Sequence, residues 1–198
     1  MEEQSKAERT RHFIIETTAG IFNTKGYAAT SMSDITEATG LTKGSIYGNF
    51  ENKEEVALAV FDYNYNKVWS LTQQQIQAAT TYYDKLMVFA SLYSEYGNCF
   101  PDGGCPILNT AVEADDTHPQ LKEKAAAAIQ KWKKTIEDII KKGIQAGEFK
   151  EGLDHSQMAL SMIALIEGGI MISKTTNSLG SLKKVLSTVA MLISGIRK

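Results

Sequence analysis

The sequence predicts an all-α protein of about nine helices and no strand. Apolar residues recur at intervals of three and four along most of the chain, which is the spacing of one face of a helix. Residue types that cap helices precede many of these apolar runs. The only prolines, Pro101, Pro106 and Pro119, lie in the middle of the chain, so both flanks are free of the strongest helix breaker.

Three helices are predicted in residues 1–51. The first is expected to stop before Gly26, because glycine commonly follows the last residue of a helix. Ser31 followed by Asp34 forms a capping-box pattern before the second helix, and Thr42 precedes the third. The predicted ranges are Lys6–Lys25, Met32–Thr39 and Lys43–Asn49.

Residues 52–198 are predicted to hold longer helices, and the domain boundary is placed between Glu51 and Asn52, where the short helices end. Asn52 followed by Glu55 is a second capping pattern. Prolines open two of the later helices, because proline suits a first helical turn, and Asp154 caps another. The predicted helices lie near residues 53–76, 86–96, 106–115, 119–146, 155–171 and 182–196.

The composition is that of an ordinary globular protein. The 198 residues are 43% hydrophobic and 22% charged with a net charge of −2, which excludes disordered, collagenous and rod-like chains. Two cysteines, Cys99 and Cys105, and a charged N-terminal segment predict a cytoplasmic protein without a secretory signal. The longest weakly charged stretch, residues 156–173, contains Glu167 and is too short and polar for a predicted membrane span.

The second and third predicted helices have the proportions of a helix-turn-helix. They are joined through Gly40, and the first helix of such a motif braces the second in the major groove of DNA. Ile46 is the only large aliphatic residue of the third helix, and the rest are glycines, short polar groups, a lysine and a tyrosine. Such a face suits base edges and phosphates.

The residues around this motif carry a family resemblance. The runs FNTKGYAATSMSDI from Phe22, TGLTKGSIYGNF from Thr39 and NKEE from Asn52 resemble the DNA-binding signature of the tetracycline-repressor-like (TetR) transcription regulators. Thr36 and Thr39 stand where the family usually has alanine. The resemblance implies a repressor with a three-helix DNA-binding domain, 1–51, and a larger helical domain, 52–198, for ligand binding and dimerisation. It also implies release from a double-stranded DNA operator when a small molecule binds.

Within the matched run, residues around the third helix are the candidates for contacting DNA. Lys43 and Lys53 can reach phosphates, Tyr47 can lie against the sugar-phosphate backbone, and Gly44 allows a close approach. The alternative is that Tyr47 and Phe50 are core residues and that both lysines are merely solvated. The candidates are Thr30, Thr42, Lys43, Gly44, Ser45, Tyr47, Asn49 and Lys53.

Aromatic residues concentrate in the fourth and fifth predicted helices and suit a pocket for a small apolar or aromatic ligand. For any one of them a core position is an equal alternative. Cys105 is expected at a helix cap, where the dipole favours a thiolate, and the alternative is a small buried cysteine that fills space. The ligand candidates are Phe61, Tyr65, Trp69, Phe89, Tyr93, Cys105, Asn109 and Trp132.

The last two predicted helices carry more apolar surface than one core needs, which predicts a homodimer through them. A charge at Ile170 or Val189 is accordingly expected to separate the subunits. Gly168 and Gly169 would allow close packing of the helices. The alternative is that this surface is buried within one subunit.

No catalytic, metal or cofactor site is predicted. Asp115, Asp116 and His118 are possible metal ligands, but they lie at a junction between helices, where such residues commonly serve as caps. No glutamate precedes a histidine at the spacing of a di-iron bundle. The alternative to a regulator is a helical small-molecule-binding protein or enzyme with a degenerate DNA-binding domain.

Overall fold

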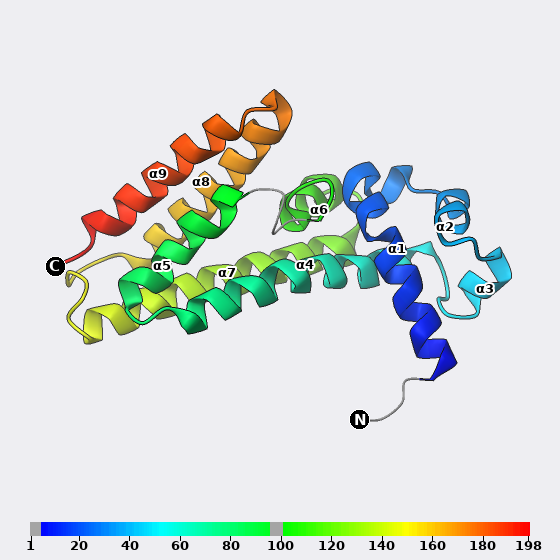
Figure 1. The fold of residues 1–198 in the computed structure, drawn as a ribbon, viewed down its shortest axis with the longest axis horizontal. Coiled ribbons are helices and arrows are strands. Elements are labelled where there is room, and N and C mark those ends of the chain that lie inside the picture. Colours follow the sequence, from blue (N-terminus) through cyan, green and yellow to red (C-terminus); the bar gives the residue numbers. More distant parts are fainter. Residues whose placement is uncertain (1–4, 96–100) are drawn as a thin grey trace. The chain divides into compact units, whose positions relative to one another are not determined.

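The computed structural model describes residues 5–95 and 101–198, which form nine α-helices and one 3₁₀ turn (Figure 1). Within these ranges the β pairing is limited to an isolated bridge between Phe149 and Arg197. The predicted all-α fold class is therefore confirmed.

α1 (Lys6–Ala29) is broken, and does not end, at the glycine that the sequence singles out. Gly26 has φ 81° and ψ 173°, which interrupts the helical geometry, and one further turn follows it. The hydroxyl of Thr30 donates to the carbonyl oxygen of Gly26 over 2.6 Å. The predicted interruption at Gly26 is therefore present, and what the sequence did not predict is the further helical turn that ends at Ala29.

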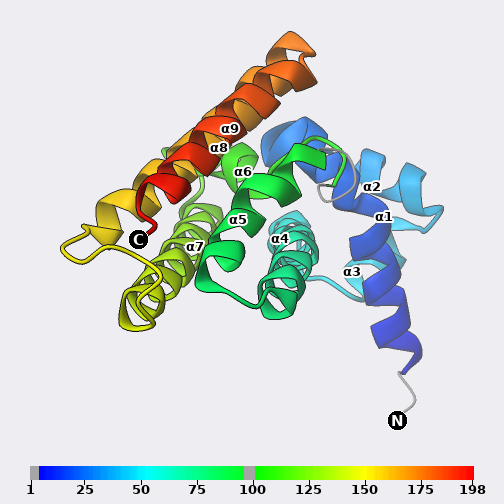
Figure 2. The ribbon, with the colours of Figure 1, turned by 60° about the vertical axis from the view of Figure 1, so that its left-hand side comes forward.

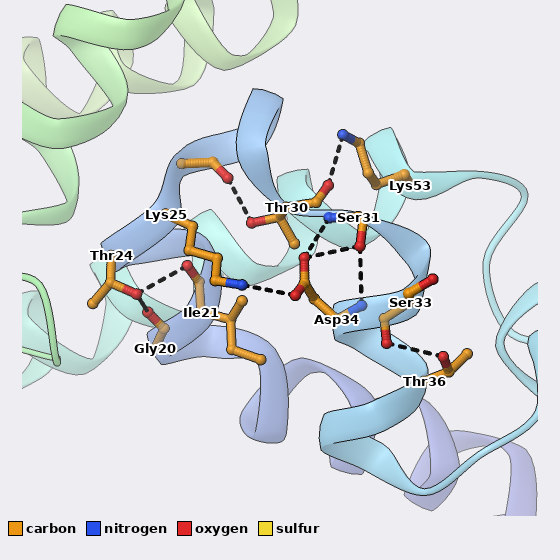
Figure 3. Close-up of polar contacts among 11 residues, drawn as sticks. Gly20, Ile21, Thr24, Lys25, Thr30, Ser31, Ser33, Asp34, Thr36 and Lys53 are labelled. Carbon is orange, nitrogen blue, oxygen red and sulfur yellow. Dashed lines mark hydrogen bonds and ion pairs between the residues drawn. The ribbon is translucent and has the colours of Figure 1, made fainter.

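α2 (Met32–Thr39) and α3 (Lys43–Tyr47) begin at their predicted caps. The Ser31 hydroxyl accepts the N–H of Asp34, and the Asp34 carboxylate accepts the N–H of Ser31 (Figure 3). The Thr42 hydroxyl accepts an N–H of the first turn of α3. The helix-turn-helix therefore has the local structure that its sequence predicts, although α3 ends two residues earlier than expected.

The remaining elements follow the predicted order. The Asn52 side chain accepts the N–H of Glu55 over 2.9 Å, and Asp154 caps a later helix in the same way. The helix predicted near residues 86–96 ends at Tyr96. Tyr96 and Cys99 both lie outside the described residues. The elements are α4 (Lys53–Ala78), α5 (Tyr82–Ser91), the 3₁₀ turn η1 (Leu92–Glu95), α6 (Pro106–Ala114), α7 (Pro119–Gln145), α8 (His155–Thr176) and α9 (Leu179–Gly195).

The chain forms two compact units. The first contains the described residues of Met1–Asn66 and Phe100–Ala126, and the second contains those of Lys67–Cys99 and Ala127–Lys198. α6 therefore belongs to the same unit as the helix-turn-helix. The core of the first unit includes Ile14 and Phe22 of α1, Ile35 of α2, Ile46 of α3, and Val56 and Val60 of α4.

In the second unit α8 and α9 lie side by side as a hairpin (Figures 1 and 2). A Cβ atom at Gly169 would lie 3.1 Å from the side chains of Leu182 and Val185, so this glycine permits the close packing that the sequence predicts. Ile170 and Val189 are almost completely buried within the subunit. A charge at either position would disrupt the subunit's own core, so these two substitutions do not test dimerisation, contrary to the sequence expectation.

By length and composition, α8 is long and apolar enough to cross a membrane. It extends beyond the weakly charged stretch 156–173 at both ends. Met162, Ile166 and Ile170 on one side of α8 are buried, and Glu167 lies in its middle. These features are those of a core helix in a globular protein.

Candidate DNA-binding surface and ligand-domain residues

α3 is held by one buried side chain and presents polar groups on its other faces. Ile46 is completely buried, whereas Tyr47 is 49% exposed. Thr42, Lys43 and Gly44 are exposed as well. Tyr47 therefore does not take the core position that the sequence left open, and the exposed groups are of the kinds that contact phosphates and base edges.

Two candidates that flank α3, Thr42 and Asn49, have hydrogen bonds to Ser45 of this helix. The Asn49 amide donates to the carbonyl oxygen of Ser45 over 2.9 Å. The Thr42 hydroxyl accepts the N–H of Ser45 over 3.2 Å. Both residues keep further hydrogen-bonding capacity, because an amide has a second N–H and a carbonyl oxygen, and a hydroxyl can still donate.

Arg11 binds the segment that follows α3. This role was not predicted from the sequence. Its guanidinium lies 4.0 Å from the ring centroid of Phe50, which is buried. The same group donates to the carbonyl oxygen of Asn49 and, over 2.7 Å, to the Glu55 carboxylate. The N–H of Glu51 and then Arg11 lower the pKa of Glu55. These contacts fix the chain between α3 and α4, and no local sequence signal joins positions so far apart.

Thr30 and Lys53 take part in the junction between α1 and α2. Thr30 is completely buried, and its hydroxyl is used at the break in α1. The Lys53 ammonium donates to the carbonyl oxygens of Thr30 and Tyr27 over 2.9 and 2.8 Å (Figure 3 shows the bond to Thr30). The structure thus gives both residues a role inside the first unit, and their contact with DNA stays a prediction.

The two threonines at unusual positions on α2 bond to their own helix. The Thr39 hydroxyl, which is buried, donates to the carbonyl oxygen of Ile35 over 2.7 Å. The Thr36 hydroxyl donates to the carbonyl oxygen of Ser33 over 3.0 Å (Figure 3). Neither hydroxyl is left without a partner, so α2 accommodates both threonines in place of alanine.

Asp34 links the N-terminus of α2 to α1. Its carboxylate lies 2.7 Å from the Lys25 ammonium and also accepts from Ser31 (Figure 3). The hydrogen bond from Lys25, followed by those from the N–H and hydroxyl of Ser31, lowers the Asp34 pKa from 3.8 to about 2. The ionised form is therefore favoured in the folded protein.

We expect Asp34→Asn to lower the unfolding temperature at pH 7. Because the folded pKa is below the unfolded one, the contribution of Asp34 is present above pH 4 and is lost as the pH falls from about 4 to about 2. Thermal unfolding of both proteins across this range should show the difference narrowing. Glu37→Gln, at an exposed acid of the same helix, is the control, and a difference that stays constant down to pH 2 would contradict the assignment.

The aromatic ligand candidates form separate groups. In the first unit, Phe61 stacks on Tyr65 with ring centroids 6.2 Å apart. In the second unit, Trp132 stacks on Phe89 and Tyr93 with centroids 6.3 and 5.7 Å apart. Trp69, also in the second unit, lies 5.2 Å from the Lys131 ammonium, measured to the ring centroid.

Trp132 combines aromatic packing with a buried donor. The side chain is 2% exposed, and no acceptor among the residues described bonds to its indole N–H. A buried N–H without a partner costs free energy, and a ligand oxygen would satisfy it. The indole N–H of Trp132 is thus a donor without an acceptor among the described residues, beside two stacked aromatic rings.

Asn109 and Cys105 lie at the start of α6 in the first unit. The Asn109 amide donates to the carbonyl oxygens of Asn23 and Gly103 over 3.0 and 2.9 Å. Asn23 in turn donates to the carbonyl oxygens of Asp102 and Gly104. This network holds the loop before α6 against α1. Cys105 is 3% exposed, which favours the alternative of a space-filling cysteine.

The cluster considered for metal binding is engaged in other contacts. His118 Nδ1 accepts the N–H of Leu121 over 3.2 Å, and Nε2 lies 3.3 Å from the Glu54 carboxylate. The histidine ring also packs edge-on against Tyr27. Within 5–95 and 101–198, no group of three residues is arranged to hold a metal ion.

Comparisons with known proteins cover nearly the whole chain. Residues 14–60 match the model of the bacterial regulatory proteins of the tetR family, and residues 83–189 match that of the tetracyclin repressor-like C-terminal domain. A TetR-family transcriptional regulator from Cytophaga hutchinsonii is 54% identical, with a TM-score of 0.95 over 99% of this chain and 98% of that one. A TetR regulator from Chloroflexus aurantiacus is 38% identical, with a TM-score of 0.93 over 97% and 98%. The fatty acid metabolism regulator protein of Bacillus subtilis is 27% identical over 96% of this chain and 98% of its own.

Proposed function

Because this chain belongs to the TetR family of DNA-binding transcriptional regulators, we propose that it is a cytoplasmic repressor released from its operator by a small molecule. The observation that carries the DNA-binding part is the two-sided α3, in which Ile46 is buried in the core and Tyr47 is exposed beside Lys43 and Gly44. The proposed division assigns DNA binding to residues 1–51, and ligand binding and dimerisation to residues 52–198.

The proposed DNA contacts come from α3 and its flanks. Lys43 and Tyr47 bind the phosphate backbone, and Ser45 and Asn49 contact phosphates or base edges. Thr42 and Gly44 lie at the start of the helix, where the backbone approaches DNA. Thr30 and Lys53 position this surface indirectly, through the hydrogen bonds that they make at the junction between α1 and α2.

The proposed ligand is apolar or aromatic and carries a hydrogen-bond acceptor. The stacked rings of Phe89, Tyr93 and Trp132 supply the apolar surface, and the indole N–H of Trp132 supplies the donor. Such a combination of apolar lining and few polar groups is usual in small-molecule sites. Phe61, Tyr65, Trp69, Cys105 and Asn109 remain ligand candidates in this proposal.

The proposed homodimer forms through α8 and α9. Both helices expose large apolar side chains although their inner faces already make a core, and exposed apolar surface of this kind favours association. The residues are Leu160, Met171 and Ile172 of α8, and Leu179, Met191 and Leu192, which lie on α9.

A selection from a random pool of DNA duplexes tests the function. The unmodified protein should enrich a sequence made of two related half-sites, and a gel shift should then show release by acceptor-bearing aromatic compounds at micromolar to millimolar concentration. Failure to enrich any sequence, together with binding of such compounds, would favour the alternative of a small-molecule-binding protein or enzyme with a degenerate DNA-binding domain. The exposed polar face of α3 argues against that alternative.

A further inference from the structure

The turn between Gly26 and Thr30 connects α1 to the helix-turn-helix. Gly26 interrupts α1, and Thr30 directly precedes Ser31, the N-terminal cap of α2. Where a helix is interrupted, the N–H groups after the break require new acceptors. The way in which this turn is held therefore determines how α2, and α3 after it, leave α1.

A carboxylate from α6 supplies the missing acceptors. Glu113 accepts the N–H of Tyr27 through one oxygen and the N–H of Ala28 through the other, both over 2.9 Å. A Cβ atom at Gly26 would lie 2.5 Å from a Glu113 oxygen, so the carboxylate lies directly against this glycine. Glu113 is distant in sequence from the turn, and no motif in the chain points to it.

A cation binds the opposite end of the same turn. The Lys53 ammonium donates hydrogen bonds to the carbonyl oxygens of Tyr27 and Thr30, and it lies 4.2 Å from the centroid of the Tyr27 ring. A helical turn is positive at its N–H end and negative at its carbonyl end. The negative Glu113 carboxylate at the N–H end and the positive Lys53 ammonium at the carbonyl end therefore complement the polarity of the turn.

We propose that Glu113 is a positioning residue for DNA recognition. Its carboxylate fixes the turn Gly26–Thr30 and, through it, the direction in which α2 and α3 leave α1. Glu113 lies on α6 and acts through Tyr27 and Ala28. This inference rests on the DNA-binding function proposed above and adds a residue from outside the helix-turn-helix on which that function depends.

The test uses the duplex selected by the unmodified protein and the variant Glu113→Ala. We expect about a tenfold or larger loss of affinity for that duplex, because two hydrogen bonds to a charged group are lost. Affinity for duplexes of random sequence should stay unchanged, since the exposed cation of α3, Lys43, is unaltered. Glu123→Ala, at an exposed acid in the same unit, is the matched control and should bind like the unmodified protein.

Chemical rescue separates positioning from a general loss of structure. Acetate can occupy the space vacated in Glu113→Ala and accept the two freed N–H groups, so sodium acetate should restore affinity relative to sodium chloride at equal ionic strength. Glu113→Gln should lose affinity without rescue, because its amide still fills the space and presents an NH₂ group to one N–H. Amide exchange at Tyr27 and Ala28 should accelerate in both variants.

The outcomes distinguish this inference from the function itself. If the unmodified protein selects no duplex, the DNA-binding function fails. If it selects one and Glu113→Ala binds that duplex with unchanged affinity, or with a loss that acetate does not reverse, only the role of Glu113 is overturned. Should Glu113→Ala fail to fold, Glu113→Gln decides in its place, and unchanged affinity for the selected duplex there, with or without accelerated amide exchange at Tyr27 and Ala28, would equally refute the role.

Discussion

Replacing Tyr47 with alanine should abolish selective DNA binding and leave the fold intact. The side chain is 49% exposed on α3, so its removal creates no cavity, and neighbouring Ile46 still anchors the helix in the core. We expect the affinity for the selected duplex to fall by about 100-fold or more, towards the level of random DNA. Fluorescence anisotropy measures the affinity, and circular dichroism and sedimentation measure the fold and the oligomeric state.

Tyr47→Phe divides the contribution of the ring from that of the hydroxyl. If the ring packs on the sugar-phosphate backbone and the hydroxyl bonds a phosphate, the phenylalanine variant should lie between the unmodified protein and the alanine variant. Val112→Ala, at a 70% exposed position on α6, controls for the loss of an exposed apolar side chain. Normal binding of the selected duplex by Tyr47→Ala would show that α3 does not enter the groove as proposed.

Met191→Glu or Met171→Glu should convert the protein to monomers with little affinity for its operator. Both methionines are more than half exposed in the subunit, at 64% and 51%, so a glutamate there is compatible with the fold. In a dimer through α8 and α9 the same charge would be buried without a partner, which costs several kcal/mol. A monomer binds only one half-site, so its affinity for the whole operator should fall to its affinity for a single half-site.

Val112→Glu is the matched control for these charges, because it places a glutamate on an exposed apolar position outside α8 and α9. Sedimentation velocity should show monomers for Met191→Glu or Met171→Glu and dimers for Val112→Glu. If all three variants are dimers, the subunits associate through a surface other than α8 and α9.

Local signals in the sequence predicted most of the helix starts. Ser31, Thr42, Asn52 and Asp154 all cap the helices they were expected to cap, because a cap depends on residues only a few positions apart. The break of α1 at Gly26 was predicted, but the helical turn after it was not, because that turn depends on a contact that is distant in sequence. The turn after Gly26 is held by Glu113, a contact between residues more than eighty positions apart.

In the candidate site, too, some features could be predicted from the local sequence and others could not. The exposed face of α3 was predictable, since Ile46 is its single large aliphatic residue and so must be the buried one. The roles of Arg11 and Lys53 were not, because a lone basic residue in a sequence gives no indication of the carbonyl groups that it will bind. Ile170 and Val189 were misjudged because an apolar stripe does not reveal whether the partner surface belongs to the same subunit or to another.

The glycines with positive φ differ in how well they should tolerate replacement, and Gly26 and Gly103 should tolerate it least. Both have positive φ, and a side chain at either would meet another group at 2.5 Å, a Glu113 oxygen or the carbonyl oxygen of Asn23. Gly40 also has positive φ, at 67°, but nothing lies within 4 Å of its missing Cβ, and asparagine can adopt that conformation. In a library of functional variants, position 40 should accept asparagine, whereas positions 26 and 103 should remain glycine.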